Sequence, residues 1–344
     1  MSKQESQELK GVAILLMLFL HLFIHENDAA SCSNIFYFNG VSLVHLMTRM
    51  ANPVPFFVML SGYGLYAAWQ RGDKHRWSRL INLVLHYWLI LLIFVEIGAF
   101  FVPTKYPGTI WDVLENLTAF NTSYNSEHWF LFPYVLLAIS APWLFKLCDK
   151  YKISIVLGTS YVMYLLTCFL ISRYGEAYLY THMIIYHPIL YGSLLFNFLL
   201  GAIACKKNWL EILNSRNIQK WAWLILILLC VVRCCLETGA FHNLYVFMFM
   251  WIWLQIVRPT WLKAFLIHMG KHSMNMWLIH SFFCYHIFHD WIYGFRYPLL
   301  IYGVLLLVSY LSSYVINLIY GLGEKGFSII VSRTRKGHLN DSIM

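Results

Sequence analysis

Long apolar stretches separated by short polar segments follow one another along this 344-residue chain. Each stretch has roughly the 17–22 residues that an α-helix needs to cross the hydrocarbon core of a bilayer. The pattern therefore predicts an all-α, polytopic transmembrane helical bundle of about ten spans, in a single integral-membrane domain over residues 1–344 without a fused soluble domain. The expected spans are residues 10–25, 51–69, 80–102, 128–146, 153–172, 187–205, 219–236, 242–257, 273–292 and 298–321.

The distribution of Lys and Arg supports this topology. If the N-terminus lies in the cytoplasm, the inner segments hold 20 of the 25 Lys and Arg residues, and each outer segment holds a single cation. Cytoplasmic segments of membrane proteins carry the excess of positive charge, so we predict that both termini are cytoplasmic. The formal net charge of +9 follows from this asymmetry and therefore requires no nucleic-acid partner.

Composition adds little to this picture. With 60% hydrophobic and 12% charged residues, the chain cannot be an ordinary soluble globular protein. The eight cysteines show no C-x-x-C pair and no metal-binding spacing, so we interpret them as small apolar packing residues and expect no metal. Of the two long outer segments, 26–50 and 103–127, the second contains helical amphipathic spacing at 109–120. That spacing predicts a helix along the membrane surface.

One titratable residue, His21, lies inside the otherwise apolar run 11–24. An ionisable group within a membrane span is costly to insert and is read by default as functional. Lys10 precedes His21 by eleven residues, which at ~100° per residue come to about 20° beyond three whole helical turns, with a rise of ~16 Å. The two side chains should therefore share one helix face. Such a face would suit a long ligand with an anionic end at the membrane edge and a reactive end in the core.

Two further patterns lie near the expected cytoplasmic edge. Arg76 and Arg79 are three residues apart, so on a helix they would form a paired guanidinium site that binds phosphates well. Anchoring by the positive-inside rule is the alternative for this pair. Ser61 stands with Gly62 and Gly64 in the second span, where small residues allow close helix packing.

Polar groups also occur at the outer ends of two spans. Glu127, His128 and Trp129 open the fourth span and could bind a sugar, although Trp at this depth is also typical of an interfacial belt. His280 is a second imidazole within a span. A metal or haem site is conceivable there, but carboxylate or cysteine partners at ligand spacing are missing.

Taken together, these segments resemble the acyltransferase family 3 membrane proteins, which are bacterial integral-membrane O-acyltransferases. The resemblance covers nearly the whole chain. This chain departs from the family pattern in carrying Lys10 where the family usually has Arg, and Lys lacks the bidentate fork. Four motifs carry the resemblance: Lys10 with His21, Phe56–Tyr63 followed by Arg76 and Arg79, His128–Leu131 at the start of a span, and Gly270–His280.

The resemblance implies transfer of an acyl group, most often acetyl, from cytoplasmic acyl-CoA to a sugar hydroxyl. The acceptor would be a lipid-linked or cell-surface glycan, and the enzyme would lie in the bilayer of the bacterial plasma membrane. His21 would act as general base, although an acyl-His intermediate is an alternative. The phosphates would bind to Lys10, Arg76 and Arg79, and the acceptor to Ser61, Glu127, His128, Trp129 and His280.

Two other classes of protein fit parts of the pattern. A transporter or glycan exporter could use His21 and His280 as a proton relay. Such a protein could lose Arg76 and Arg79 with little effect beyond topology, whereas a CoA site needs them. A histidine-ligated haem protein would show a Soret band on purification.

Overall fold

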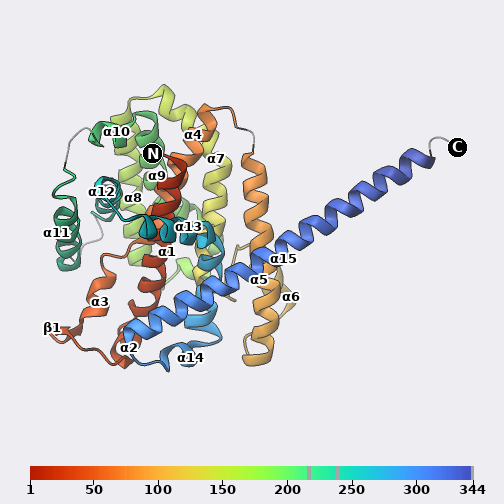
Figure 1. The fold of residues 1–344 in the computed structure, drawn as a ribbon, viewed down its shortest axis with the longest axis horizontal. Coiled ribbons are helices and arrows are strands. Elements are labelled where there is room, and N and C mark those ends of the chain that lie inside the picture. Colours follow the sequence, from red (N-terminus) through yellow and green to blue (C-terminus); the bar gives the residue numbers. More distant parts are fainter. Residues whose placement is uncertain (74, 215–217, 237–240, 342–344) are drawn as a thin grey trace.

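The computed structural model describes residues 1–73, 75–214, 218–236 and 241–341, without the side chains of Arg76 and of residues 326–341. The described chain is almost entirely helical, as predicted (Figure 1). Seven stretches of helix in it are long and apolar enough to cross a membrane. They correspond to α1 (Lys3–Phe23), α4 (Pro53–Gln70), α5 (Arg76–Phe101), α7 (Leu131–Lys150), α8 (Ile153–Tyr174), α9 (Met183–Lys206) and α15 (Pro298–Asp341).

Three other predicted spans are also helical but differ from the expected lengths. α11 (Ala222–Cys235) and α12 (His242–Gln255) have 14 residues each, about 21 Å of helix, so ten complete spans stay a prediction. The helix expected at 273–292 runs instead over α13 (Thr260–Ser281). Lys263, His268 and Lys271 lower the hydropathy of its N-terminal part, and Pro259 is its N-cap.

Short elements connect the long helices. The helix predicted within 109–120 is confirmed as α6 (Ile110–Leu117), which begins with a capping box formed by Thr109 and Asp112. Its place along the membrane surface stays a prediction. A two-stranded antiparallel hairpin, β1 (Tyr37–Phe38) and β2 (Val41–Ser42), follows α2. The remaining connecting elements are α2 (Glu26–Ser31), α3 (Leu43–Thr48), α10 (Trp209–Asn214), α14 (His289–Tyr293), the 3₁₀ turns η1 (Ser126–Phe130) and η2 (Leu179–Thr181), and the π-helical turn η3 (Phe282–His286).

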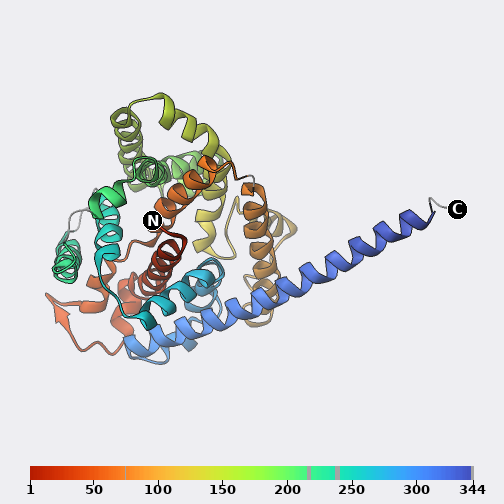
Figure 2. The same cartoon turned by 45° about the horizontal axis from the view of Figure 1, so that its top comes forward.

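The helix α1 lies in the middle of the bundle, beside α4 and α13 (Figures 1 and 2). Its contact with α13 is so close that only glycine fits at two positions. A Cβ atom at Gly11 would lie 2.0 Å from the backbone oxygen of Leu266, and one at Gly270 would lie 1.9 Å from that of Gln7. Small residues permit this backbone approach in membrane bundles. The C-terminal ends of α1 and α13 also meet, where the rings of His21 and His280 lie 4.9 Å apart between centroids.

Candidate active site

Four polar side chains from four elements meet at the C-terminal end of α1. We call them the His21 cluster: His21 of α1, Glu127 of η1, His280 of α13 and Tyr285 of η3. His21 Nε2 lies 3.3 Å from Glu127 Oε2, and the rings of His21 and His280 have centroids 4.9 Å apart. The side chains of His21 and Glu127 keep 15% and 18% of their surface exposed, so a small group can reach the pair.

Hydrogen bonds assign the proton on the His21 ring. The Tyr285 hydroxyl donates to the backbone oxygen of His21, which leaves its own oxygen free to accept. His21 Nδ1 lies 3.3 Å from that oxygen and is therefore the donor nitrogen. Nε2 then faces the Glu127 carboxyl group. An imidazole held in this tautomer is suited to accept a proton at Nε2.

His280 presents a second acceptor nitrogen beside the first. Its Nδ1 donates to the backbone oxygen of Trp277 over 2.7 Å, and its Nε2 has no hydrogen-bond partner among the described residues. The side chain is fully buried. A buried acceptor without a partner is costly unless a ligand or water donates to it. His280 Nε2 can therefore accept a hydrogen bond from a hydroxyl bound next to His21.

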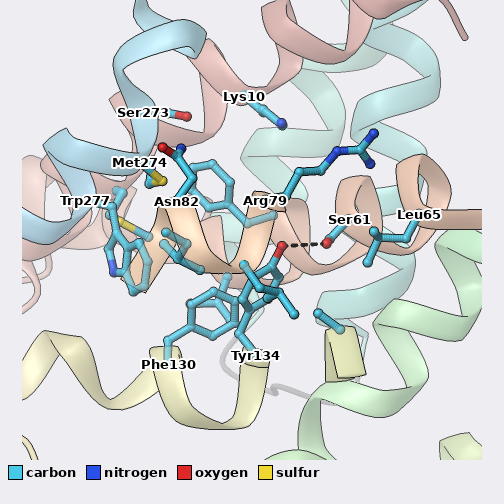
Figure 3. Close-up of a pocket in the computed structure, with 16 residues that line it drawn as sticks. Lys10, Ser61, Leu65, Arg79, Asn82, Phe130, Tyr134, Ser273, Met274 and Trp277 are labelled. Atoms are coloured by element: carbon cyan, nitrogen blue, oxygen red, sulfur yellow. Dashed lines mark hydrogen bonds between the residues drawn. The ribbon is translucent and has the colours of Figure 1, made fainter. Parts of the chain in front are cut away.

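A cavity of about 330 Å³ extends inward from this region between α1, α4, α5, α7 and α13. We call it the inner cavity. Figure 3 shows Lys10 and Arg79 at one end of it and Phe130 and Trp277 at the other. Ser61 also lines it, and Ser61 Oγ lies 3.0 Å from the Tyr134 hydroxyl. The volume is typical of a site for a small ligand or for part of a larger one, about 300–1,000 Å³.

Three elements each carry one residue of the His21 cluster and, about one turn away, one residue that lines the inner cavity. In an α-helix, residues three or four apart lie on one face, and in a 3₁₀ turn residues three apart are eclipsed. The separation along each element is roughly 4.5–6 Å. The rings of Phe130 and Trp277, which line this end of the cavity, pack edge to face with their centroids 5.4 Å apart. The pairs, cavity residue first, are Met17 and His21 in α1, Phe130 and Glu127 in η1, and Trp277 and His280 in α13.

The other end of the inner cavity is cationic. Arg79 forms an ion pair with Asp73, and its side chain keeps 51% of its surface exposed. A hydrogen bond from the backbone N–H of His75, 2.8 Å long, and the Arg79 guanidinium lower the pKa of the Asp73 carboxyl. Lys10 is half-buried and faces the same space. Arg76 begins α5, but its side chain lies outside the described residues.

The remaining predicted residues occupy different surroundings. His128 is fully buried, and its Nε2 lies 2.8 Å from the backbone oxygen of Leu278, so a role in acceptor binding stays a prediction for this residue. Trp129 lines another cavity, between α4, α8, α9 and α12. Sequence reasoning missed Tyr285 and the contact of Glu127 with His21, because no local spacing connects residues so far apart in the chain.

The charged donors at one end of the inner cavity suit an anion. Among the residues that the structure describes, no group of three or more His, Cys, Asp or Glu side chains could hold a metal ion. Lys10 and Arg79 could hold a phosphorylated ligand, because both provide charged N–H donors to one cavity.

Comparison with known proteins gives one match. The model of a protein family described as an acyltransferase domain matches residues 8–318, which contain the His21 cluster and every residue that lines the inner cavity. No curated protein and no solved structure matches the chain.

Proposed function

The chain belongs to this acyltransferase family, and on that premise we propose which donor, acceptor and residues it uses. It is a membrane O-acyltransferase, and we propose that it transfers an acyl group, acetyl in the simplest case, from acyl-CoA to a hydroxyl of a cell-surface or lipid-linked glycan. One observation carries this proposal. A histidine–carboxylate pair, His21 and Glu127, lies one helical turn beyond a cavity whose other end holds Lys10 and Arg79.

The shape and charge of the inner cavity support acyl-CoA as the donor. Acyl-CoA carries phosphates at one end and a thioester at the end of a long flexible arm. Lys10 and Arg79, with Arg76 beside them in sequence, bind the phosphates, and the arm extends toward Trp277. This orientation puts the phosphates on the cytoplasmic side of a bacterial plasma membrane, with both chain termini in the cytoplasm as the Lys and Arg distribution predicts.

The His21 cluster supplies the proton chemistry. The acceptor hydroxyl donates its proton to His21 Nε2 as its oxygen attacks the thioester carbonyl carbon. Glu127 stabilises the imidazolium that forms, because its carboxylate lies beside the same nitrogen. The C–S bond then breaks, and the departing thiolate takes the proton from His21. The products are an O-acyl ester and free CoA, and His280 Nε2 accepts a hydrogen bond from a second, neighbouring hydroxyl of the acceptor during the reaction.

Membranes from cells that produce the protein test this proposal. Supplied with acetyl-CoA labelled in the acetyl group, they should transfer label to glycan in a form that mild alkali releases, because esters hydrolyse in alkali and amides do not. Membranes without the protein are the control. If no label is transferred, or if the transferred label resists alkali, the proposed reaction is wrong.

A transporter is the second candidate, and one contact favours it. The rings of His21 and His280 lie close enough for a proton relay through one bridging hydroxyl or water. Such a relay has no need of cations in the inner cavity. An Arg79→Ala variant that retained full biological activity would therefore favour the transporter, and loss of activity with loss of CoA binding would exclude it.

A further inference from the structure

A second cavity, of about 490 Å³, lies between the first residues of α4 and α12, the last turns of α8 and the first half of α9. We call it the outer cavity, because the predicted topology places these ends on the outer side. It adjoins the inner cavity at Val54, which lines both. The turn η1 also separates the two: Trp129 lines the outer cavity and the next residue, Phe130, lines the inner one.

Buried amide groups without partners line the outer cavity. Asn197 is 2% exposed, and its Oδ1 has no hydrogen-bond partner among the described residues. Asn52 Nδ2 is equally without a partner there, and Asn243, also 2% exposed, lines the same space. Asn197 lies fourteen residues into α9, about 21 Å from its outer end. A buried amide this deep in a membrane protein is costly unless it forms hydrogen bonds, so we expect the cavity to contain water or a polar ligand.

The side chains that line the outer cavity favour an uncharged polar ligand. No Asp, Glu, Lys or Arg belongs to its described lining, whereas the inner cavity has both Lys10 and Arg79. Arg233 lies behind this lining, in contact with His242, and is not itself a lining residue. A side-chain amide can both donate and accept hydrogen bonds, and so can a hydroxyl group, so the two can pair in either direction. Trp129, Tyr164 and Tyr186 add flat aromatic faces to the same lining.

These features together fit a sugar ring, which has an apolar C–H face and a rim of hydroxyl groups. We propose that the outer cavity binds an uncharged sugar ring of the acceptor, with Asn197 and Asn243 bonding its hydroxyls and Trp129 packing against its C–H face. The assignment to the acceptor rests on the proposed function. The turn η1 connects the two sites, since it places Trp129 in this cavity and Glu127 beside His21.

A cysteine in the cavity provides a direct test. Cys168 is half-buried, is a free thiol and lines the outer cavity, whereas Cys235 is exposed and lies elsewhere. The protein, held in nanodiscs free of sugar-headed detergent, is labelled with N-ethylmaleimide, and labelling at each cysteine is followed by mass spectrometry. The probes are the methyl glycosides of glucose, galactose, N-acetylglucosamine and rhamnose at millimolar concentration. A bound ring slows labelling of Cys168 by the factor 1 + [L]/Kd, about tenfold at about ten times Kd.

We expect at least one glycoside to protect Cys168 while Cys235 is labelled at an unchanged rate. Asn197→Leu should abolish the protection. Asn275→Leu, which changes another buried amide outside both cavities, should retain it and controls for loss of folding. Protection by none of the glycosides would mean that the cavity holds only water and would overturn the proposal.

Acetyl-CoA is the remaining probe, and it separates this proposal from the proposed function. It should leave the labelling of Cys168 unchanged. Protection by acetyl-CoA would assign the outer cavity to the donor and overturn the sugar site. If a glycoside protects Cys168 but calorimetry detects no binding of acetyl-CoA, the sugar site stands and the proposed acyl donor is wrong.

Discussion

The inner and outer cavities differ in the chemistry of their walls although they adjoin at Val54. The inner cavity has two cations at one end and aromatic rings at the other, whereas the outer cavity has amides, aromatic rings and no Asp, Glu, Lys or Arg in its described lining. A charged ligand is thus favoured on one side and an uncharged polar ligand on the other. Under the proposed function, this difference would let a single bundle bind two unlike substrates.

The turn η1 is the element that keeps the two sites apart and connects them. Successive residues of a 3₁₀ turn point about 120° apart, so a few residues can face several surroundings. Glu127 contacts His21, Trp129 lines the outer cavity and Phe130 lines the inner one. The asparagine before the turn, Asn125, accepts a hydrogen bond from Ser281, which fixes η1 to the end of α13.

The largest effect is expected from removing His21, the proposed general base for the reaction between the two substrates. His21→Ala should lower acyl transfer roughly 10²–10⁴-fold, because a general base contributes about that much to the rate. The measurement is the acetyl content of surface glycans by mass spectrometry, with the amount of protein in the membrane followed by immunoblot. Binding of acetyl-CoA and protection of Cys168 by a sugar should both remain. Loss of either would show that His21 shapes that cavity.

His182→Ala is the matched control for this variant, since it removes an exposed histidine at the N-cap of α9, away from the His21 cluster. It should transfer acetyl groups at the parental rate. Full activity in the His21→Ala variant would contradict the assignment of the general base.

The second effect would separate the two cavities by charge. Arg79→Ala and Lys10→Ala should each weaken acetyl-CoA binding about 10- to 150-fold, because a charge-assisted hydrogen bond contributes roughly 1.5–3 kcal/mol. Lys10→Arg should bind as well as the parent or better, since a guanidinium grips phosphate in two places. Calorimetry measures the donor, and protection of Cys168 by a sugar, unchanged in all three variants, is the control.

Unchanged acetyl-CoA affinity in both alanine variants would mean that these cations only set the topology. A collapsed kcat at saturating donor with an unchanged KM in the Lys10→Ala variant would instead place Lys10 in the catalytic centre. Arg76→Ala belongs in the same experiment, because its spacing to Arg79 predicts a shared role.

A third variant tests how the inner cavity ends. Met17, Phe130 and Trp277 line the end of the inner cavity that is nearest to the His21 cluster, so we expect them to contact the acyl group of the bound donor. Met17→Ala should shift the preference between acetyl-CoA and butyryl-CoA about tenfold toward butyryl, because each methylene in a fitted pocket is worth roughly 1–3 kcal/mol. Competition calorimetry measures the ratio. Leu65→Ala, at the other end of the cavity, is the control and should leave the preference unchanged. An unchanged preference in Met17→Ala would show that Met17 does not limit chain length.

Helical period and charge distribution predicted much of the inner cavity. The expectation that Lys10 and His21 share a face is confirmed by the unbroken helix α1, in which Lys10 and Met17 line the cavity and His21 follows one turn later. Ser61 and Arg79 also line this cavity. These residues could be found because regular spacing along one helix, or at its end, is visible in sequence.

The outer cavity and the His21–Glu127 contact could not be found in this way. They depend on how distant helices pack, and no periodicity links His21 with residues more than a hundred positions away. Asn197 and Asn243 are single polar residues in apolar runs, which sequence alone cannot distinguish from paired or solvated amides. The start of α13 was misplaced for a related reason, because Lys263 and Lys271 lower its hydropathy.

The smallest effect is expected from changing the ionic strength, which should affect ligand binding in the inner cavity but not in the outer cavity of the unmutated protein. Arg79 is half-exposed, so its attraction for phosphate is screened as the Debye length falls from about 30 Å at 0.01 M to about 8 Å at 0.15 M ionic strength. Acetyl-CoA should therefore bind severalfold more weakly at the higher salt, which is less than the loss expected on deleting a cation. Asp73 does not complicate this measurement: the His75 N–H and Arg79 lower its pKa, so it stays ionised between about pH 6 and 8.

An uncharged sugar in the outer cavity should protect Cys168 equally at both ionic strengths. Salt-independent binding of acetyl-CoA would place its phosphates away from Lys10 and Arg79, and salt-dependent protection of Cys168 would mean that the ligand of the outer cavity carries charge.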